Sequence, residues 1–520
     1  MLVLLCSLAC STTPQGRVDD SAEPLDPEVA VLSLGSVQGL SQENGAIQFL
    51  GLPFAAPPVG DRRFQAPAPP QAWETTWVAD TAPQPCLQYD SVAEEARGDE
   101  DCLYLNLWRP QAVPAEGAPV LVFIHGGGNV TGSAVEETSS GALLYDGGPL
   151  AAQEEVVVVT LQYRLNAFGY LADPSLDDAE PSGNYGPRDQ VAALQWVQDH
   201  IAAFGGDPSR VLVFGESGGA SDVCGLLATP SADGLFHGAG VMSGGCGGYQ
   251  RDDMLEMGST VADAVGCGDT QDRAACLREA DAEDVLMAVQ RASTATGLVT
   301  AWAGPTIDGV FLPESPADAL AAGRHHPVPV LIGVTADETS SPLFGIPFGL
   351  TEETYEGLVH TWFPLIATDI LAAYPVASYG SPRAALVAMT TDLQFTCPTQ
   401  VFAESASQWT PVYHYVYDHS YDGTHAGSFH PKWFGAAHGF ELPLLFGTLD
   451  TYDDYIPSEG ELTLGRQMGS MWAELARTGT PGADWPPYSS ESPQSLVFTT
   501  PDLSTVQAYA ADQCAFWTGF

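Results

Sequence analysis

The chain has 520 residues, of which 45% are hydrophobic and 16% are charged, so it can bury a large core and is not disordered as a whole. Its 65 acidic residues against 17 Lys and Arg residues give a formal net charge of −48. A surface of this sign repels nucleic-acid phosphates and anionic membranes, so neither is expected as a partner. Such self-repulsion suits a salty or acid-tolerant setting, and it is equally consistent with compositional drift in a lysine-poor genome.

The first residues resemble the end of an export signal, because an apolar run is followed by small residues before Cys10. Residues 7–10 (SLAC) form an imperfect bacterial lipobox, whose cysteine would be acylated after cleavage. We expect residues 1–10 to be a signal remnant, 11–28 an acidic tether and 29–520 a single domain. No later apolar run reaches the roughly 18 residues that span a bilayer. The expected protein is exported: secreted, periplasmic or lipid-anchored through Cys10.

Short runs of β-branched residues predict strands buried on both faces of a parallel sheet. They are Val120–Ile124, Val156–Gln162, Val211–Phe214, Val330–Val334 and Val412–Tyr417. Between the second and third runs, apolar residues recur at helical spacing from Val191 to Phe204. Alternating strands and helices predict an α/β fold with right-handed crossovers. Residues 250–325 are predicted to be helical and 340–410 irregular, both as excursions from the sheet.

The sharpest motif is Gly-x-Ser-x-Gly around Ser217, directly after the strand that ends at Phe214. Between a strand and a helix this motif forms a nucleophile elbow, a tight turn that exposes the serine hydroxyl. The helix that starts there also aims its N-terminal amides at nearby negative charge. The motif alone is common in loops, and its position between strand and helix makes it specific.

A glycine run, residues 125–128 (HGGG), follows the predicted strand Val120–Ile124. Bare glycines allow backbone N–H groups to approach a substrate oxygen, although the same run also occurs in ordinary turns. Together with the elbow downstream, the run favours an oxyanion hole.

These motifs resemble those of the type-B carboxylesterase and cholinesterase family, which has the α/β-hydrolase fold. Residues 204–219 (FGGDPSRVLVFGESGG) fit the family's serine motif, and residues 100–110 (EDCLYLNLWRP) fit its second motif. Residues 51–60 (GLPFAAPPVG) and 184–190 (NYGPRDQ) match further blocks. The resemblance runs from about residue 30 to Trp517. It implies a large, mostly parallel sheet flanked by helices and an ester hydrolase with a small-molecule substrate.

The resemblance also implies the roles of the catalytic residues. Ser217 is the nucleophile, Glu338 in residues 334–339 (VTADET) is the acid, and His438 in residues 435–443 (GAAHGFELP) is the base. The order Ser, Glu, His is that of α/β-hydrolases. The oxyanion donors are the amides of Gly127, Gly128 and Gly218. Thr339 stands where the family usually has glycine.

Two further acids, Glu216 and Asp222, are expected beside the triad. Asp222 replaces a serine that in relatives bonds to the triad acid. We expect Asp222 to support Glu338 by sharing a proton, or to help orient His438. The alternative is that Asp222 caps a backbone amide.

Eight of the ten cysteines lie in the body of the chain, which is unusual for a reducing cytosol. The resemblance implies three disulfides: Cys86 with Cys102, Cys267 with Cys276, and Cys397 with Cys514. Cys224 and Cys246 have no family partner, and they either pair with each other or remain free thiols. The first disulfide loop lacks the tryptophan that stacks on choline in cholinesterases, and it contains Tyr89 instead. Choline esters are therefore not the expected substrates.

Other functions fit the motifs less well than ester hydrolysis does. Members of the family that act in adhesion lose the serine, which is present here, and a lipase would act on longer acyl chains. His414, His419, His425 and His430 lie near acids but match no compact ligand spacing, so no metal or cofactor is expected.

Overall fold

The computed structural model describes residues 27–90, 93–296, 303–426 and 431–519. The signal remnant, Cys10 and residues 11–26 of the expected tether lie outside the described residues. The first described strand starts at Val29. None of the described helices is both long and apolar enough to cross a membrane.

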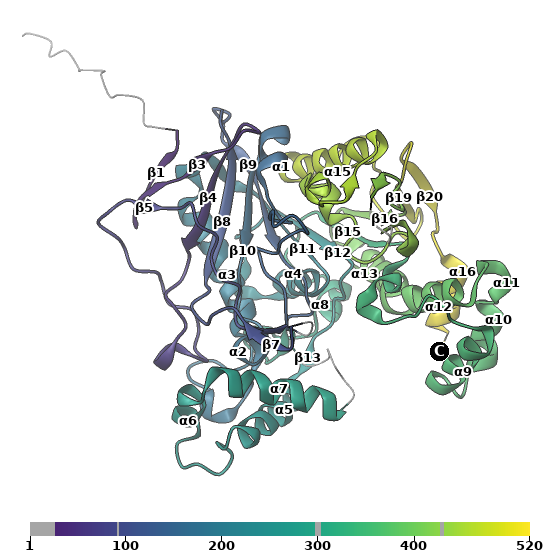
Figure 1. Ribbon diagram of the computed structural model, residues 1–520, viewed down its shortest axis with the longest axis horizontal. Coiled ribbons are helices and arrows are strands. Elements are labelled where there is room, and N and C mark those ends of the chain that lie inside the picture. The colour runs from purple at the N-terminus through teal and green to yellow at the C-terminus, as the bar shows by residue number, and fades with distance from the viewer. Residues whose placement is uncertain (1–26, 91–92, 297–302, 427–430, 520) are drawn as a thin grey trace, which may run out of the picture.

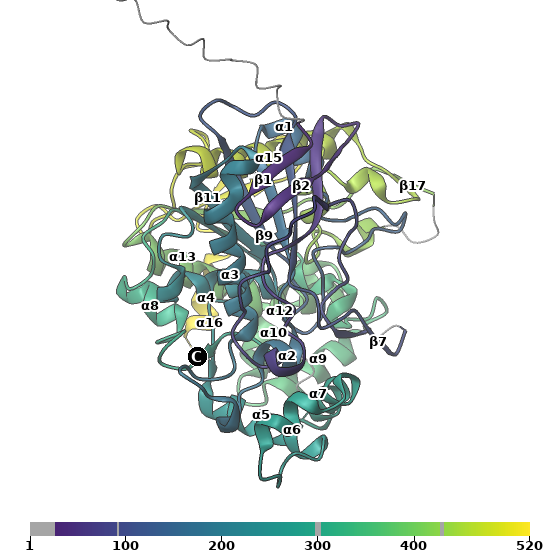
Figure 2. The same cartoon turned by 90° about the vertical axis from the view of Figure 1, so that its left-hand side faces the viewer.

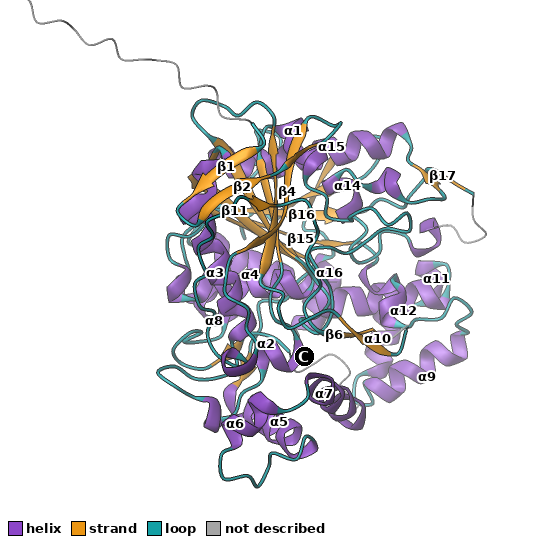
Figure 3. Cartoon of the chain, turned by 60° about the vertical axis from the view of Figure 1, so that its left-hand side comes forward, coloured by secondary structure: helices purple, strands orange, loops and turns teal. Residues whose placement is uncertain are grey.

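One large sheet organises the described chain, with strands in the middle of the molecule and helices on both sides (Figure 3). Seven neighbouring strands are parallel, and both borders are antiparallel. In spatial order the strands are β20 (Ser504–Gln507), β19 (Gln494–Phe498), β16 (Val412–Tyr417), β15 (Val330–Thr335), β12 (Gly238–Met242), β11 (Gly206–Glu216), β9 (Ala118–Ile124), β10 (Val157–Leu161), β8 (Tyr104–Pro110), β4 (Ala46–Pro53) and β3 (Leu40–Ser41). All five predicted strands are confirmed as members of this sheet.

Side chains of the central strand β9 alternate between two cores, as the pleat requires. Val120, Val122 and Ile124 belong to the core that includes residues of α3 (Tyr185–His200), α4 (Gly218–Ala228) and α13 (Cys397–Ser407). Leu121 and Phe123 belong to the opposite core, with α1 (Gly148–Glu154), α14 (Leu442–Phe446) and α15 (Glu459–Thr478). Burial on both faces explains the continuous apolar runs in these strands.

Two helical groups project from the sheet. The predicted helical region 250–325 contains α5 (Arg251–Ala264), α6 (Arg273–Glu279), α7 (Ala282–Thr296) and α8 (Pro316–Ala322). Helices α5 to α7 lie at the end of the molecule opposite α1 and α15 (Figures 1 and 2). The short helix α2 (Asn166–Tyr170) lies between β10 and α3 in the chain, and its apolar residues join a core with those of α5 and α7.

The expectation that residues 340–410 are irregular is wrong. They form α9 (Glu352–Trp362), α10 (Ala367–Ala373), α11 (Val376–Tyr379), α12 (Pro382–Thr391) and α13, with α16 (Ala511–Thr518) packed beside them. These helices are short and are separated by residues such as Pro375 and Gly380, so helical periodicity rarely persists along the sequence. Helices α9, α10 and α12 share a separate apolar core that includes Tyr355, Ile370 and Leu386.

The remaining strands form small sheets. They are β1 (Val29–Leu32) with β2 (Gly35–Gln38) and β5 (Trp77–Val78), β6 (Gln88–Asp90) with β7 (Glu95–Arg97), β13 (Tyr249–Gln250) with β14 (Thr306–Ile307), and β17 (Thr424–His425) with β18 (Tyr455–Ile456).

Four disulfides join the eight described cysteines. Three are those implied by the family resemblance: Cys86–Cys102, Cys267–Cys276 and Cys397–Cys514. The pair that the sequence left open, Cys224–Cys246, is bonded and ties α4 to the segment after β12.

Candidate active site

Ser217 stands at the turn between β11 and α4. Its φ is 56°, a left-handed conformation that is uncommon for residues other than glycine, and its N–H donates to the Met242 carbonyl at 2.9 Å. The turn is tight, because a Cβ added at Gly219 would lie 2.2 Å from the Ile124 carbonyl oxygen. Only glycine therefore fits two residues after the serine, as a nucleophile elbow requires.

Glu338 and His438 meet beside this elbow, from segments 100 residues apart. The Nδ1 atom of His438 lies 2.5 Å from Glu338 Oε2, and the other carboxylate oxygen accepts the Thr335 N–H at 2.8 Å. Glu338 is fully buried. A carboxylate that receives Nδ1–H fixes the tautomer of the imidazole and leaves Nε2 to act as a base.

The Nε2 atom of His438 lies 3.2 Å from Glu216 Oε1, the carboxyl of the residue just before the serine. Among the described residues, the Ser217 hydroxyl makes no hydrogen bond. The structure therefore places the His438 ring beside the elbow, with Nε2 facing Glu216. Catalytic hydrogen bonds commonly tighten only when substrate is bound.

Three carboxyl groups share the field of this imidazole. Burial alone would lower the pKa of His438, but Glu216 and Glu338 together raise it to about 10. Burial raises the pKa of Glu216 to about 7, and it raises that of Glu441 well above its usual value. Both oxygens of Glu441 are buried, and neither has a hydrogen-bond partner in the part of the chain that the structure describes. The protonation states of His438, Glu216 and Glu441 are therefore coupled to one another. Sequence reasoning missed Glu441, although it lies within the motif that holds His438.

The oxyanion loop, which we define as residues 125–132, runs from the end of β9 past the serine. A Cβ added at Gly126 would lie 3.0 Å from Ser217 Cβ. A Cβ added at Gly218 would lie 2.9 Å from the backbone nitrogens of Gly128 and Asn129. The loop and the N-terminus of α4 thus approach each other at Ser217, where an oxyanion hole needs its donors.

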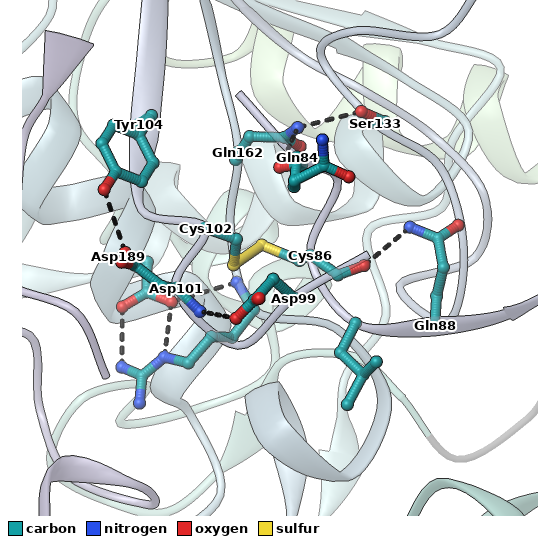
Figure 4. The surroundings of a disulfide bond; sticks show 12 residues. Gln84, Cys86, Gln88, Asp99, Asp101, Cys102, Tyr104, Ser133, Gln162 and Asp189 are labelled. Atoms are coloured by element: carbon teal, nitrogen blue, oxygen red, sulfur yellow. Dashed lines mark hydrogen bonds and ion pairs between the residues drawn. A yellow bond between two sulfur atoms is a disulfide. The ribbon is translucent and has the colours of Figure 1, made fainter. Parts of the chain in front are cut away.

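The first disulfide loop, whose Cys86, Gln88 and Cys102 are drawn in Figure 4, supports the far end of the oxyanion loop through Gln88. The Gln88 side chain donates to the carbonyls of Cys86 at 2.9 Å and Gly132 at 2.8 Å, and it accepts the Gly132 N–H at 2.9 Å. Figure 4 also shows Gln162, whose amide donates to Ser133 Oγ at 2.9 Å. The backbone just after the oxyanion loop is therefore fixed from outside the triad.

Asp222 lies away from the triad residues that the sequence predicted it to contact, and it bonds to the oxyanion loop instead. Its Oδ1 accepts from Asn129 Nδ2 at 3.0 Å, and its Oδ2 accepts from Gln190 Nε2 at 2.6 Å. Among the described residues it bonds to neither Glu338 nor His438, and to no backbone amide, so the expected support of the triad acid, the expected help in orienting His438 and the capping alternative are all wrong. The reason is the direction of the helix face: Asp222 lies one turn after Gly218 and faces the oxyanion loop.

Two aromatic rings lie beside the imidazole of His438. The ring centroids of Phe344 and Phe395 lie 5.6 and 5.3 Å from that of His438. Both come from the region expected to be irregular, and no sequence motif marked them.

One side-chain cluster offers ligands of the kind that bind metals. Atoms of His419, Asp422 and Glu461 lie within 4.8 Å of one another. Glu461 already accepts from Tyr455 and Ser458, and with Ser458 it forms the capping box of α15. These bonds within the protein explain why the three side chains lie close together: Glu461 caps the N-terminus of α15. His414 bonds to Ser495 instead, and His430 lies outside the described residues.

Comparisons with known proteins agree with this geometry. A model of the carboxylesterase family matches residues 26–517. The para-nitrobenzyl esterase of Bacillus subtilis (strain 168) is 36% identical, over 90% of this chain and 94% of its own length. A human cocaine esterase is 33% identical, over 97% of this chain and 92% of its own. A solved PNB esterase superposes with a TM-score of 0.78 at 32% identity, covering 95% of this chain and 100% of its own. The chain therefore belongs to the carboxylesterase family, has the α/β-hydrolase fold and is a carboxylic ester hydrolase.

Proposed function

We propose that the chain hydrolyses carboxylic esters through an acyl-enzyme on Ser217. His438 Nε2 accepts the hydroxyl proton as the oxygen attacks the ester carbonyl, and Glu338 stabilises the imidazolium through Nδ1–H. The proton then passes to the leaving alcohol. Water activated by the same histidine attacks the acyl-enzyme and releases the acid.

The negative charge that develops on the carbonyl oxygen is expected among the amides of Gly127, Gly128 and Gly218. Each donor contributes roughly 3 kcal/mol, by analogy with the removal of single donors elsewhere. The observation that carries the proposal is the 2.5 Å contact of His438 with Glu338 beside a serine with φ 56°. No step requires a metal or an organic cofactor.

The test compares Ser217→Ala with Ser221→Ala, a matched change at a serine one turn along α4. Ser217→Ala should abolish nearly all hydrolysis of p-nitrophenyl butyrate and all labelling by diisopropyl fluorophosphate. Ser221→Ala should keep most activity and the label. Substantial hydrolysis by folded Ser217→Ala, or loss of wild-type activity on treatment with EDTA, would overturn the proposal.

We propose short to medium acyl esters as substrates. The rings of Phe344 and Phe395 beside His438 support this choice, because they occupy space next to the reacting centre. The acidic surface also disfavours an anionic lipid interface. Across a panel of p-nitrophenyl esters, kcat/KM should be highest at short chains. Faster turnover of emulsified long-chain triglyceride would instead assign a lipase.

Export remains our proposal for the location, and the four disulfides support it because such bonds persist in oxidising compartments. Intact mass of the native protein from fractionated cells should show processing at Cys10 and no free thiol among the eight described cysteines. Cytosolic protein with reduced thiols is the contrary result.

A further inference from the structure

Helix α4 touches the oxyanion loop at two points, one helical turn apart. The first is Gly218, whose missing side chain lets the nitrogens of Gly128 and Asn129 come close. The second is Asp222, whose Oδ1 accepts the Asn129 amide at 3.0 Å. Residues four apart lie on one helix face, so a single face of α4 both admits the loop and holds it.

Asn129 is the residue through which the loop is held. Its φ is 61°, a conformation that asparagine tolerates better than most residues, and it is 2% exposed. Its Oδ1 lies 3.0 Å from the Tyr163 hydroxyl, which is also 2.9 Å from the His125 carbonyl at the start of the loop. Its own carbonyl accepts the Asn166 N–H at 2.7 Å. The side chain and backbone of Asn129 are therefore both fixed.

Asp222 is suited to holding Asn129, because the polar side chains that contact it are hydrogen-bond donors. Asn129 and Gln190 each donate to a different carboxylate oxygen, and the Tyr170 hydroxyl lies 3.4 Å from Oδ2. When ionised, the Asp222 carboxylate only accepts, and its bonds to such donors are stronger than those of neutral groups. The side chain is almost fully buried, so the bonds are not exchanged with water.

We propose that Asp222 is a positioning residue of the oxyanion hole: by holding Asn129, it keeps the amides of Gly127 and Gly128 in place opposite Gly218. The inference rests on the proposed function, because it needs an oxyanion to form at Ser217. It concerns residues 129 and 222 as a pair, and it assigns neither of them to the triad. Misplacing catalytic groups by about 1 Å costs on the order of 100-fold in rate.

The experiment measures kcat and KM for p-nitrophenyl butyrate, and Ki for a trifluoromethyl ketone whose adduct places an oxyanion in the hole. Asp222→Ala and Asn129→Ala should each lower kcat by roughly 10- to 100-fold with little change in KM. Ki should rise by a similar factor. The double variant should be no worse than the more impaired single variant, because both changes break one contact.

Two controls separate positioning from general damage. Gln190→Ala removes a bond to Asp222 but keeps the Asn129 contact, so it should cost less in kcat than Asp222→Ala. Asp222→Asn should recover much of kcat, because Gln190 Oε1, which has no hydrogen-bond partner among the described residues, can turn to receive the new amide while Asn129 keeps its acceptor.

The outcomes remain distinguishable from failure of the proposed function. If diisopropyl fluorophosphate does not label the wild type at Ser217, the proposed function fails and the inference fails with it. If the wild type is labelled, additive losses in the double variant or a loss confined to thermal stability would overturn the inference alone. Should Asp222→Ala not fold, Asn129→Ala carries the same prediction for kcat and Ki.

Discussion

Glu338 and Glu216 face opposite nitrogens of one imidazole, and their effects on catalysis are expected to differ. Glu338 contacts Nδ1, where a negative charge stabilises the imidazolium that the proposed mechanism forms during attack. Glu216 contacts Nε2, the nitrogen that accepts the serine proton in the proposed mechanism. A negative charge beside Nε2 stabilises the protonated imidazole, and His438 must lose this proton before it can act as a base.

Glu216→Gln should therefore shift the pH profile. Removing the negative charge beside Nε2 lowers the pKa of His438, which Glu216 and Glu338 raise to about 10 against the effect of burial. The acid limb of kcat/KM should move to lower pH by roughly one unit or more. Glu314→Gln, which removes a carboxyl paired with Arg324 at the surface, should leave the limb unchanged. An unmoved limb in Glu216→Gln would show that Glu216 does not govern the base.

At the scale of elements, the disulfides differ in the length of chain they close. Cys397–Cys514 spans 117 residues and joins α13 to α16, whereas Cys267–Cys276 spans 9 residues between α5 and α6. In the chain-entropy account, a longer closed loop removes more freedom from the unfolded state.

Replacing Cys397 and Cys514 by alanine should lower the free energy of unfolding by about 5 kcal/mol, against about 3 kcal/mol for the Cys267 and Cys276 pair. Urea denaturation of both double variants measures the difference, with the second pair as the control. A larger loss at Cys267–Cys276 would mean that local packing outweighs loop length.

The elements that were predictable from sequence are those whose pattern is set by the large sheet. Strands buried on both faces produce apolar runs that are visible without knowing their neighbours, and the elbow depends on glycines at fixed spacing. Helices α9 to α12 are short and bury their apolar residues in a core of their own, so their pattern is weak. The partner of Asp222 was unpredictable for another reason. The sequence predicts that Asp222 lies one helical turn after Gly218 on α4, but only the packed structure shows that this turn faces Asn129.

For the whole molecule, buried acids should make stability depend on pH in an unusual direction. Burial raises the pKa of Asp222 and Glu216 to about 7 and that of Asp392 to about 6. Between about pH 4 and 7 the folded chain therefore binds more protons at these groups than the unfolded chain does, so their contribution falls as pH rises. Glu461 acts oppositely: although burial opposes the effect, bonds from His419 and Tyr455 lower its pKa to about 2. Its contribution is lost only below about pH 4.5.

The free energy of unfolding should accordingly be larger at pH 5 than at pH 8, and urea denaturation at the two values measures this. For Asp222 alone, raising the pKa from 3.8 to about 7 corresponds to roughly 4 kcal/mol at full effect. Asp222→Asn should flatten this part of the profile. A wild type that is less stable at pH 5 than at pH 8 would contradict the prediction.

The disulfide pattern has a consequence for how the chain matures. The described cysteines are bonded in consecutive pairs along the sequence, and no bond encloses or crosses another. Eight cysteines can pair in roughly a hundred ways. On the export route proposed above, an oxidase that joins thiols in the order in which they emerge from a translocon would reach the native pairing directly, without isomerisation. The bond from Cys397 closes last, once α16 has emerged.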